Sequence, residues 1–186
     1  MTEHVHVEGA SKRIALLIAV LALCLALVET GAKSTQTDAI TRNVESANLW
    51  AFFQARTIRQ TTVRTAAEQA EIEKLGLTDP AARAALEAQQ KTWRDMAARW
   101  DDDPKGGEGR KQLAERATAA EAIRARSLAK YHMYEFSGAA FQVAIVVVSA
   151  SIVTSVPLLA VGGIVVAVIG AALGLLGLLA PTLIHF

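Results

Sequence analysis

The chain has 186 residues, of which 52% are hydrophobic and 20% are charged, and 19 basic residues nearly balance 18 acidic ones. A surface that follows nucleic-acid phosphates needs an unbalanced basic patch, so we expect no nucleic-acid partner. The charged residues are unevenly distributed along the chain. Residues 14–28 and 137–184 contain none, and most charged residues lie between Glu29 and Glu135. This distribution predicts an all-α membrane protein with a polar insert.

Residues 1–11 are expected to form a flexible tail, and residues 12–32 a first transmembrane helix. The uncharged run Ile14–Val28 is shorter than the roughly 20 residues that cross a hydrocarbon core, so Lys12 and Arg13 would extend to the headgroups. A cleavable signal peptide is the rival interpretation. Lys12 and Arg13 would then be its basic region, and the small residues 30–32 its cleavage site.

Residues 136–156 and 157–184 are predicted to form the second and third transmembrane helices. Pro157 separates them, and a proline cannot continue the hydrogen-bond ladder of the helix before it. A single kinked helix over the same residues would be far longer than a bilayer is thick. A tight turn before Pro157 therefore predicts a transmembrane hairpin and a total of three spans.

Small residues recur at steps of three and four along the third span. They are Gly163, Ala167, Gly170, Gly174, Gly177 and Pro181. Such a stripe lets another helix approach closely in lipid, either from the same chain or from another subunit. No Asp, Glu, Lys, Arg or His lies in the middle of a span, which argues against the ion sites and proton relays of a transporter.

Residues 33–135 are expected to form an extramembrane α-helical stalk, an antiparallel hairpin or up-down bundle of about three helices. The first helix would end at Gly76, a usual position for a C-cap glycine, and Asp79-Pro80 would begin the second. Residues 101–110, "DDDPKGGEGR", form the expected loop, and the third helix leads back to the membrane.

Two aromatic groups are expected to meet inside this stalk. The segment "NLWAFFQARTIRQ", residues 48–60, carries Trp50, Phe52 and Phe53 together with Arg56 and Arg59. The second helix carries a coiled-coil-like seam at steps of three and four, made of Ala82, Leu86, Gln89, Trp93, Met96 and Trp100. We expect the first group to pack against Trp93 and Trp100. The alternative is a docking surface for a partner, since aromatics and Arg are favoured anchors.

Candidate catalytic and metal-binding motifs are weak. His4 and His6 supply at most two ligands, and the Asp run that begins at Asp101 lacks the spacing of a Ca²⁺ loop. The glycines that follow lack the Lys-Ser/Thr ending of a phosphate-binding loop, and no nucleophile motif is present. We therefore expect no enzyme activity, no metal, no cofactor and no small-molecule substrate.

The stretch "WAFFQARTIR", residues 50–59, resembles the W-A-Y-Y-Q-A-K-S-I-K signature of a bacterial membrane-protein family classified only as a domain of unknown function. The order of tail, first span, polar segment, motif and paired C-terminal spans is similar as well. Phe52 and Phe53 replace the common Tyr residues, Arg56 replaces Lys, and Thr57 replaces Ser. The resemblance implies three spans and assigns no catalytic residue.

These observations favour a membrane-anchored helical scaffold or accessory subunit that self-associates or binds a larger membrane complex. Its partners would be membrane lipid and either copies of itself or other subunits. The alternative is an oligomeric channel or permeability protein. The expected location is the bacterial inner membrane. The stalk would be cytoplasmic, because basic residues beside the span ends are more numerous in the insert than at Lys12 and Arg13.

Overall fold

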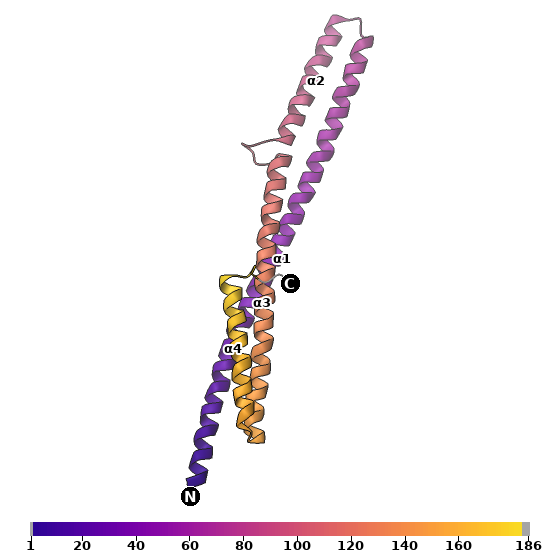
Figure 1. The fold of residues 1–186 in the computed structure, drawn as a ribbon. Helices are drawn as coiled ribbons and strands as arrows, with labels where there is room; N and C mark the ends of the chain where they lie inside the picture. The colour runs from indigo at the N-terminus through magenta and orange to yellow at the C-terminus, as the bar shows by residue number, and fades with distance from the viewer. Residues whose placement is uncertain (1, 184–186) are drawn as a thin grey trace. The chain divides into compact units, whose positions relative to one another are not determined.

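The computed structural model describes residues 2–183, with side chains described from residue 12 onward. It contains the helices α1 (Thr2–Gly76), α2 (Pro80–Asp101), α3 (Arg110–Thr154) and α4 (Pro157–Leu179), and no strand occurs among the described residues (Figure 1). The expectation of an all-α chain is confirmed. α1, α3 and α4 each contain a stretch long and apolar enough to cross a membrane, which confirms the predicted number of candidate spans.

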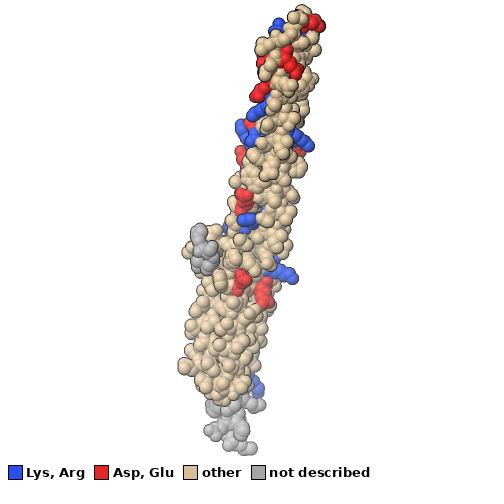
Figure 2. Space-filling view, turned by 90° about the vertical axis from the view of Figure 1, so that its right-hand side faces the viewer, with Lys and Arg blue, Asp and Glu red and all other residues tan. Residues whose placement is uncertain are grey.

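The chain divides into two compact units, which we name by their composition. The apolar unit comprises Met1–Ile40 and Ile123–Phe186, and the polar unit comprises Thr41–Ala122. Figure 2 shows the Lys, Arg, Asp and Glu side chains gathered mainly over the helices of the polar unit. α1 and α3 each contribute to both units.

α1 is one continuous helix, although the sequence suggested a separate tail, span and stalk helix. Its backbone is helical across residues 2–11, where a flexible tail was expected; the side chains of residues 1–11 lie outside the description. No break occurs between residues 32 and 37. The hydroxyls of Thr30 and Thr37 bond back to the carbonyls of Ala26 and Lys33, at 2.7 and 2.9 Å, so these polar side chains are satisfied without ending the helix.

The two tight turns follow the local chemistry that predicted them. Asp79 caps α2, its Oδ1 accepting from the Ala81 backbone N–H at 3.0 Å, and Pro80 occupies the first helical position. Between α3 and α4, Ser155 has a positive φ of 56° and Pro157 begins α4. The chain therefore reverses at this point within a very short connection.

The core of the apolar unit lies where α1, α3 and α4 meet. Leu21 of α1, Phe141 and Val148 of α3 and Ala167 of α4 belong to one buried cluster, in which Val148 is completely inaccessible. This shared burial shows that α1 packs with the α3–α4 hairpin.

The small-residue stripe of α4 packs against α3 of the same chain. Gly163, Ala167, Gly170 and Gly177 are buried and Gly174 is half-buried. The buried Ser137 hydroxyl donates to the Gly170 carbonyl at 2.7 Å, which is a direct bond between the two helices. Of the two partners that the sequence left open for this stripe, a helix of the same chain is the one observed.

Gly163→Ala tests the α3–α4 contact. A methyl group at this position would lie 2.4 Å from Val148 Cγ2 and 3.1 Å from the Ala144 carbonyl oxygen. Overpacking of this kind costs about 1–3 kcal/mol, so we expect a lower unfolding temperature in detergent, measured by circular dichroism.

Gly162→Ala is the matched control, because nothing lies within 4 Å of the added methyl group. It should be neutral or stabilising by up to about 1 kcal/mol, through helix propensity. Equal unfolding temperatures for the two variants would contradict the observed contact.

Candidate functional site

The polar unit is organised by one face of α1. The buried and half-buried side chains alternate at steps of three and four, the spacing of a coiled-coil seam. They are Ser46, Leu49, Phe53, Arg56, Gln60, Val63, Ala67, Ala70 and Lys74. α2 and the first part of α3 contact this inner face.

α2 runs antiparallel to the C-terminal part of α1. The amide Nε2 of Gln90 donates to the Ala67 carbonyl at 2.8 Å and to Glu71 Oε2 at 2.6 Å. From the other direction, Gln60 Nε2 donates to the Ala97 carbonyl at 3.0 Å. Two nearly inaccessible glutamines therefore fix the register of this helix pair through hydrogen bonds to backbone.

The predicted seam of α2 is wrong at two positions. Gln89 and Met96 are exposed, and the neighbouring Gln90 and Ala97 are buried in their place. Hydrogen bonds between α1 and α2 explain this difference. Because Ala97 is small, Gln60 of α1 can reach the Ala97 carbonyl, which a methionine side chain facing α1 would obstruct. Gln90 in turn finds two acceptors on α1.

α3 also begins antiparallel to α1. Trp50 Nε1 donates to Glu121 Oε1 at 2.8 Å, and the Arg56 guanidinium pairs with the Glu108 carboxylate at 2.5 Å. α2 and α3 thus pack along α1 one after the other. The additional reversal of the chain that the sequence suggested near residues 101–110 does not occur, because α1 is long enough to pair with both helices in turn.

Arg110 connects the three helices where α2 ends and α3 begins. Its Nη1 donates to Gln60 Oε1 at 2.6 Å and lies 3.1 Å from Asp101 Oδ1. Its guanidinium carbon lies 5.0 Å from the centre of the Phe53 ring, a cation–π contact. Phe53 in turn meets the Trp50 ring edge to face at 5.4 Å.

We call this set of contacts the junction clasp. It consists of Trp50, Phe53, Arg56 and Gln60 of α1, Asp101 of α2, and Glu108, Arg110 and Glu121, which lie in α3 or just before it. Three residues predicted from the aromatic motif, Trp50, Phe53 and Arg56, therefore share one place. Sequence reasoning missed Gln60 and the charged partners Asp101, Glu108, Arg110 and Glu121, because single polar residues far apart in the chain carry no local signal of pairing.

The other predicted aromatic residues lie elsewhere. Trp50 and Phe53 pack around Leu113 and Ala117 of α3, in a cluster that does not include Trp93 or Trp100. Trp93 and Trp100 are half-buried on α2.

The outer side of the motif remains exposed. The Phe52 side chain is 60% exposed and Arg59 is exposed as well. The motif is thus divided between an inner face that forms the junction clasp and an exposed outer face.

The loop between α2 and α3 is closed by its own carboxylates. Asp103 accepts from the Gly106 backbone N–H at 3.0 Å, and Gly107 adopts a positive φ of 68°. Asp102 accepts from Lys111 Nζ at 2.9 Å and from Gln112 at 2.7 Å. These bonds, first of all that from Lys111, lower the pKa of Asp102 below its ordinary value of 3.8.

The described residues do not bring together a set of ligands for a metal ion. Among the side chains from residue 12 to 183, no three His, Cys, Asp or Glu residues lie close enough for one. His132 lies 3.6 Å from Glu135, and His4, His6 and His185 fall outside the described side chains. The polar groups of the junction clasp bond one another, which suits them to hold helices in register.

Residues 10–180 match the family described as Domain of unknown function (DUF4337). Since this match covers most of the chain, the chain belongs to that family. No curated protein matches the chain, and no solved structure does.

Gln60→Leu tests the junction clasp. It removes the partner of the Ala97 carbonyl and of Arg110, and leaving such groups unsatisfied costs about 1–3 kcal/mol. We expect a lower urea midpoint, followed by the fluorescence of the three Trp residues, which all lie in the polar unit. Gln54→Leu, at an exposed position one to two turns earlier, is the control and should change the midpoint little.

Asp102→Asn tests the contribution of the loop to acid stability. Because the folded pKa of Asp102 lies below 3.8, its stabilising effect is complete above that pH and is lost as the pH falls through the folded value. The wild-type unfolding temperature should therefore fall more steeply below about pH 4 than that of the variant. Parallel curves of unfolding temperature against pH for the wild type and Asp102→Asn would show that Asp102 contributes nothing to acid stability. Asp95→Asn, which removes an exposed ion pair within α2, is the comparison variant.

Proposed function

We propose that this member of the DUF4337 family is a membrane-anchored helical scaffold or accessory subunit, without catalytic activity, that self-associates or binds a larger membrane complex. In this proposal α1, α3 and α4 cross the bacterial inner membrane through residues 12–32, 136–156 and 157–184. The polar unit is then a stalk on the cytoplasmic side. The length and apolar character of the three helices support the membrane placement.

The junction clasp supports a structural role for the polar unit. Its ionisable side chains each have a partner from another helix or from the loop before α3, as in the pairs Arg110–Asp101 and Arg56–Glu108. Groups used in this way fix the relative positions of helices, and a scaffold needs such rigidity to present a surface to a partner.

The observation that carries the proposal is the outer face of α1. Opposite the inner face, a second series of positions at steps of three and four is exposed throughout and contains no charged residue. We call it the outer strip, and it consists of Val44, Asn48, Ala51, Ala55, Ile58, Thr62, Thr65, Gln69 and Ile72. A seam of this spacing is suited to another helix.

Thr62 adds little polarity to this face. Its hydroxyl donates to the Ile58 carbonyl at 2.9 Å, so this hydrogen-bonding group is engaged within α1. Ile58 and Ile72 are 68% and 71% exposed, and exposed apolar surface of this extent marks interaction sites.

Ile58→Glu should therefore reduce assembly. A carboxylate in the middle of an apolar helix contact loses its water without gaining a partner, which costs several kcal/mol on association. In mild detergent, the Ile58→Glu variant is expected to have a smaller native mass than the full-length wild-type protein. The mass falls either because copies of the variant separate or because a copurifying subunit is lost.

Ala88→Glu, at an exposed position of α2, introduces the same charge outside the outer strip and should leave the mass unchanged. A wild-type protein that is strictly monomeric and free of partners would contradict the proposal, as would equal masses for all three proteins. An oligomeric channel, the alternative interpretation, has no specific observation in its favour among the described residues and stays a prediction.

A further inference from the structure

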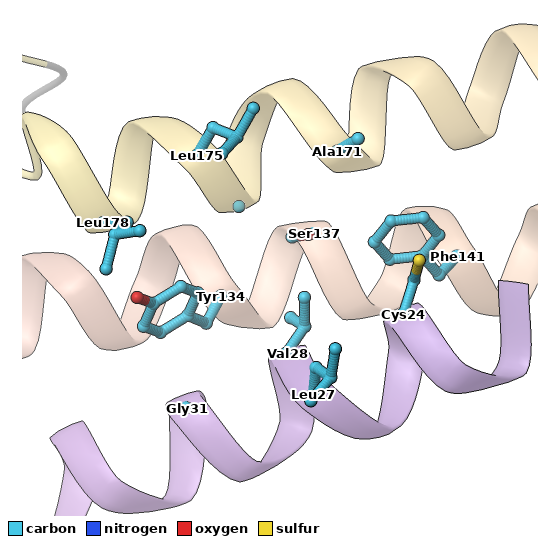
Figure 3. A pocket seen from close by; sticks show the side chains of 11 residues that line it. Cys24, Leu27, Val28, Gly31, Tyr134, Ser137, Phe141, Ala171, Leu175 and Leu178 are labelled. Atoms are coloured by element: carbon cyan, nitrogen blue, oxygen red, sulfur yellow. The ribbon is translucent and has the colours of Figure 1, made fainter. Parts of the chain in front are cut away.

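A groove of about 360 Å³ lies within the apolar unit, between α1 and α4 and over α3 (Figure 3). Its walls include Cys24 and Val28 of α1, Tyr134 and Phe141 of α3, and Leu178 of α4. Figure 3 shows Phe141 and Cys24 together at one end and Tyr134 toward the other.

The groove exists because small residues leave space between the helices. Gly31 of α1 and Gly174 of α4 line it without side chains, and Ser137 lies between them on α3. An added Cβ at Gly31 would lie 3.3 Å from the Tyr134 ring, and one at Gly174 would lie 3.0 Å from Ser137 Oγ. The space is therefore kept open by residues that cannot be enlarged without moving their neighbours.

The lining offers a polar group to a ligand at one end only. Ser137 already donates its hydroxyl to the Gly170 carbonyl, so it is satisfied within the protein. The Tyr134 hydroxyl has no hydrogen-bond partner among the described residues, and in Figure 3 it points away from the end formed by Cys24 and Phe141. A ligand of matching chemistry has a long apolar part and a polar group at one end.

Unpaired positive charge lies near the Tyr134 end, because Lys130 precedes Tyr134 by one helical turn on the same face of α3. Lys33 follows Gly31 by only two residues and therefore lies on another side of α1 from the groove. Neither ammonium has a carboxylate partner among the described residues.

The nearby carboxylates, by contrast, are engaged within the chain. Glu29 accepts from Gln142 at 3.2 Å, and Asp38 accepts from the Ser127 hydroxyl. Glu135 accepts from Tyr131 at 3.4 Å. The donors that lack a partner at this end are therefore the Tyr134 hydroxyl and the Lys130 ammonium, and donors of this kind complement a phosphate group.

We propose that this groove binds one acyl chain of a glycerophospholipid. The chain lies along Val28 and Phe141, and the ester and phosphate lie at the Tyr134 hydroxyl and the ammonium of Lys130. The volume is within the range of small-molecule pockets, and hydrocarbon chains surround helices that cross a bilayer. The inference rests on the membrane placement under the proposed function, and adds to it a site for one retained lipid.

The first test fills the groove. Ala171 lines it and Ala172 does not, although both are exposed on α4, so Ala171→Phe and Ala172→Phe add the same bulk inside and outside the groove. The full-length proteins are purified in maltoside, exchanged into fresh detergent with phosphatidylglycerol and then without it, and weighed by native mass spectrometry. Wild type and Ala172→Phe should retain one phospholipid per chain, and Ala171→Phe should lose it while keeping its helical circular dichroism.

The second test removes the charge that faces the phosphate. Lys130→Gln should lower phospholipid retention. Lys33→Gln removes one cation from another side of α1 and should not. Neither residue lies in the outer strip, so a change in lipid content is separable from a change in assembly.

Equal retention by Ala171→Phe and Ala172→Phe would overturn the proposal, as would a wild-type chain that retains no phospholipid. A change in protein assembly in Ala171→Phe without loss of lipid would also overturn it, because the groove would then hold a helix of a second copy. If instead Ile58→Glu fails to alter assembly while the lipid results hold, the scaffold role alone fails.

Discussion

The rest of the structure depends on the continuity of α1. This single helix of 75 residues supplies the wall against which α3 and α4 pack in the apolar unit and the inner face that α2 and α3 contact in the polar unit. A helix advances by a fixed rise and rotation, so the register of every contact along α1 is linked to the next. Within the polar unit, a break in α1 would therefore disturb the pairing with both α2 and α3.

The helices pack against one another in different ways in the two units. In the apolar unit, helices approach because side chains are missing, as at Gly163 and Gly170, and dispersion contacts replace them. In the polar unit, Gln60 and Gln90 extend across the contact and bond backbone carbonyls. Glutamine at a seam position gives a register that alanine alone would leave undefined, since a one-residue slip would leave buried amides unsatisfied.

The sequence predicted those features whose cause is local. The helix end at Gly76, the Asp79–Pro80 start and the turn before Pro157 follow from the chemistry of single residues, and the small stripe of α4 follows from its spacing. The seam of α2 was displaced by one residue at two positions, because Ala-rich helices offer little hydrophobic contrast between faces. The partners of Trp50 and Arg56 could not be predicted either, since Glu121 and Glu108 are distant in the chain and resemble any other exposed acid.

The uncharged stretches of α1 and α4 differ in length, and this has a consequence for the bilayer. At the helical rise Ile14–Val28 covers about 22 Å, whereas Pro157–Leu179 covers about 34 Å. Both belong to one packed unit, so no uniform hydrocarbon thickness matches both sides of the proposed anchor. Placed as proposed, the bilayer would therefore be thinner beside α1 than beside α4.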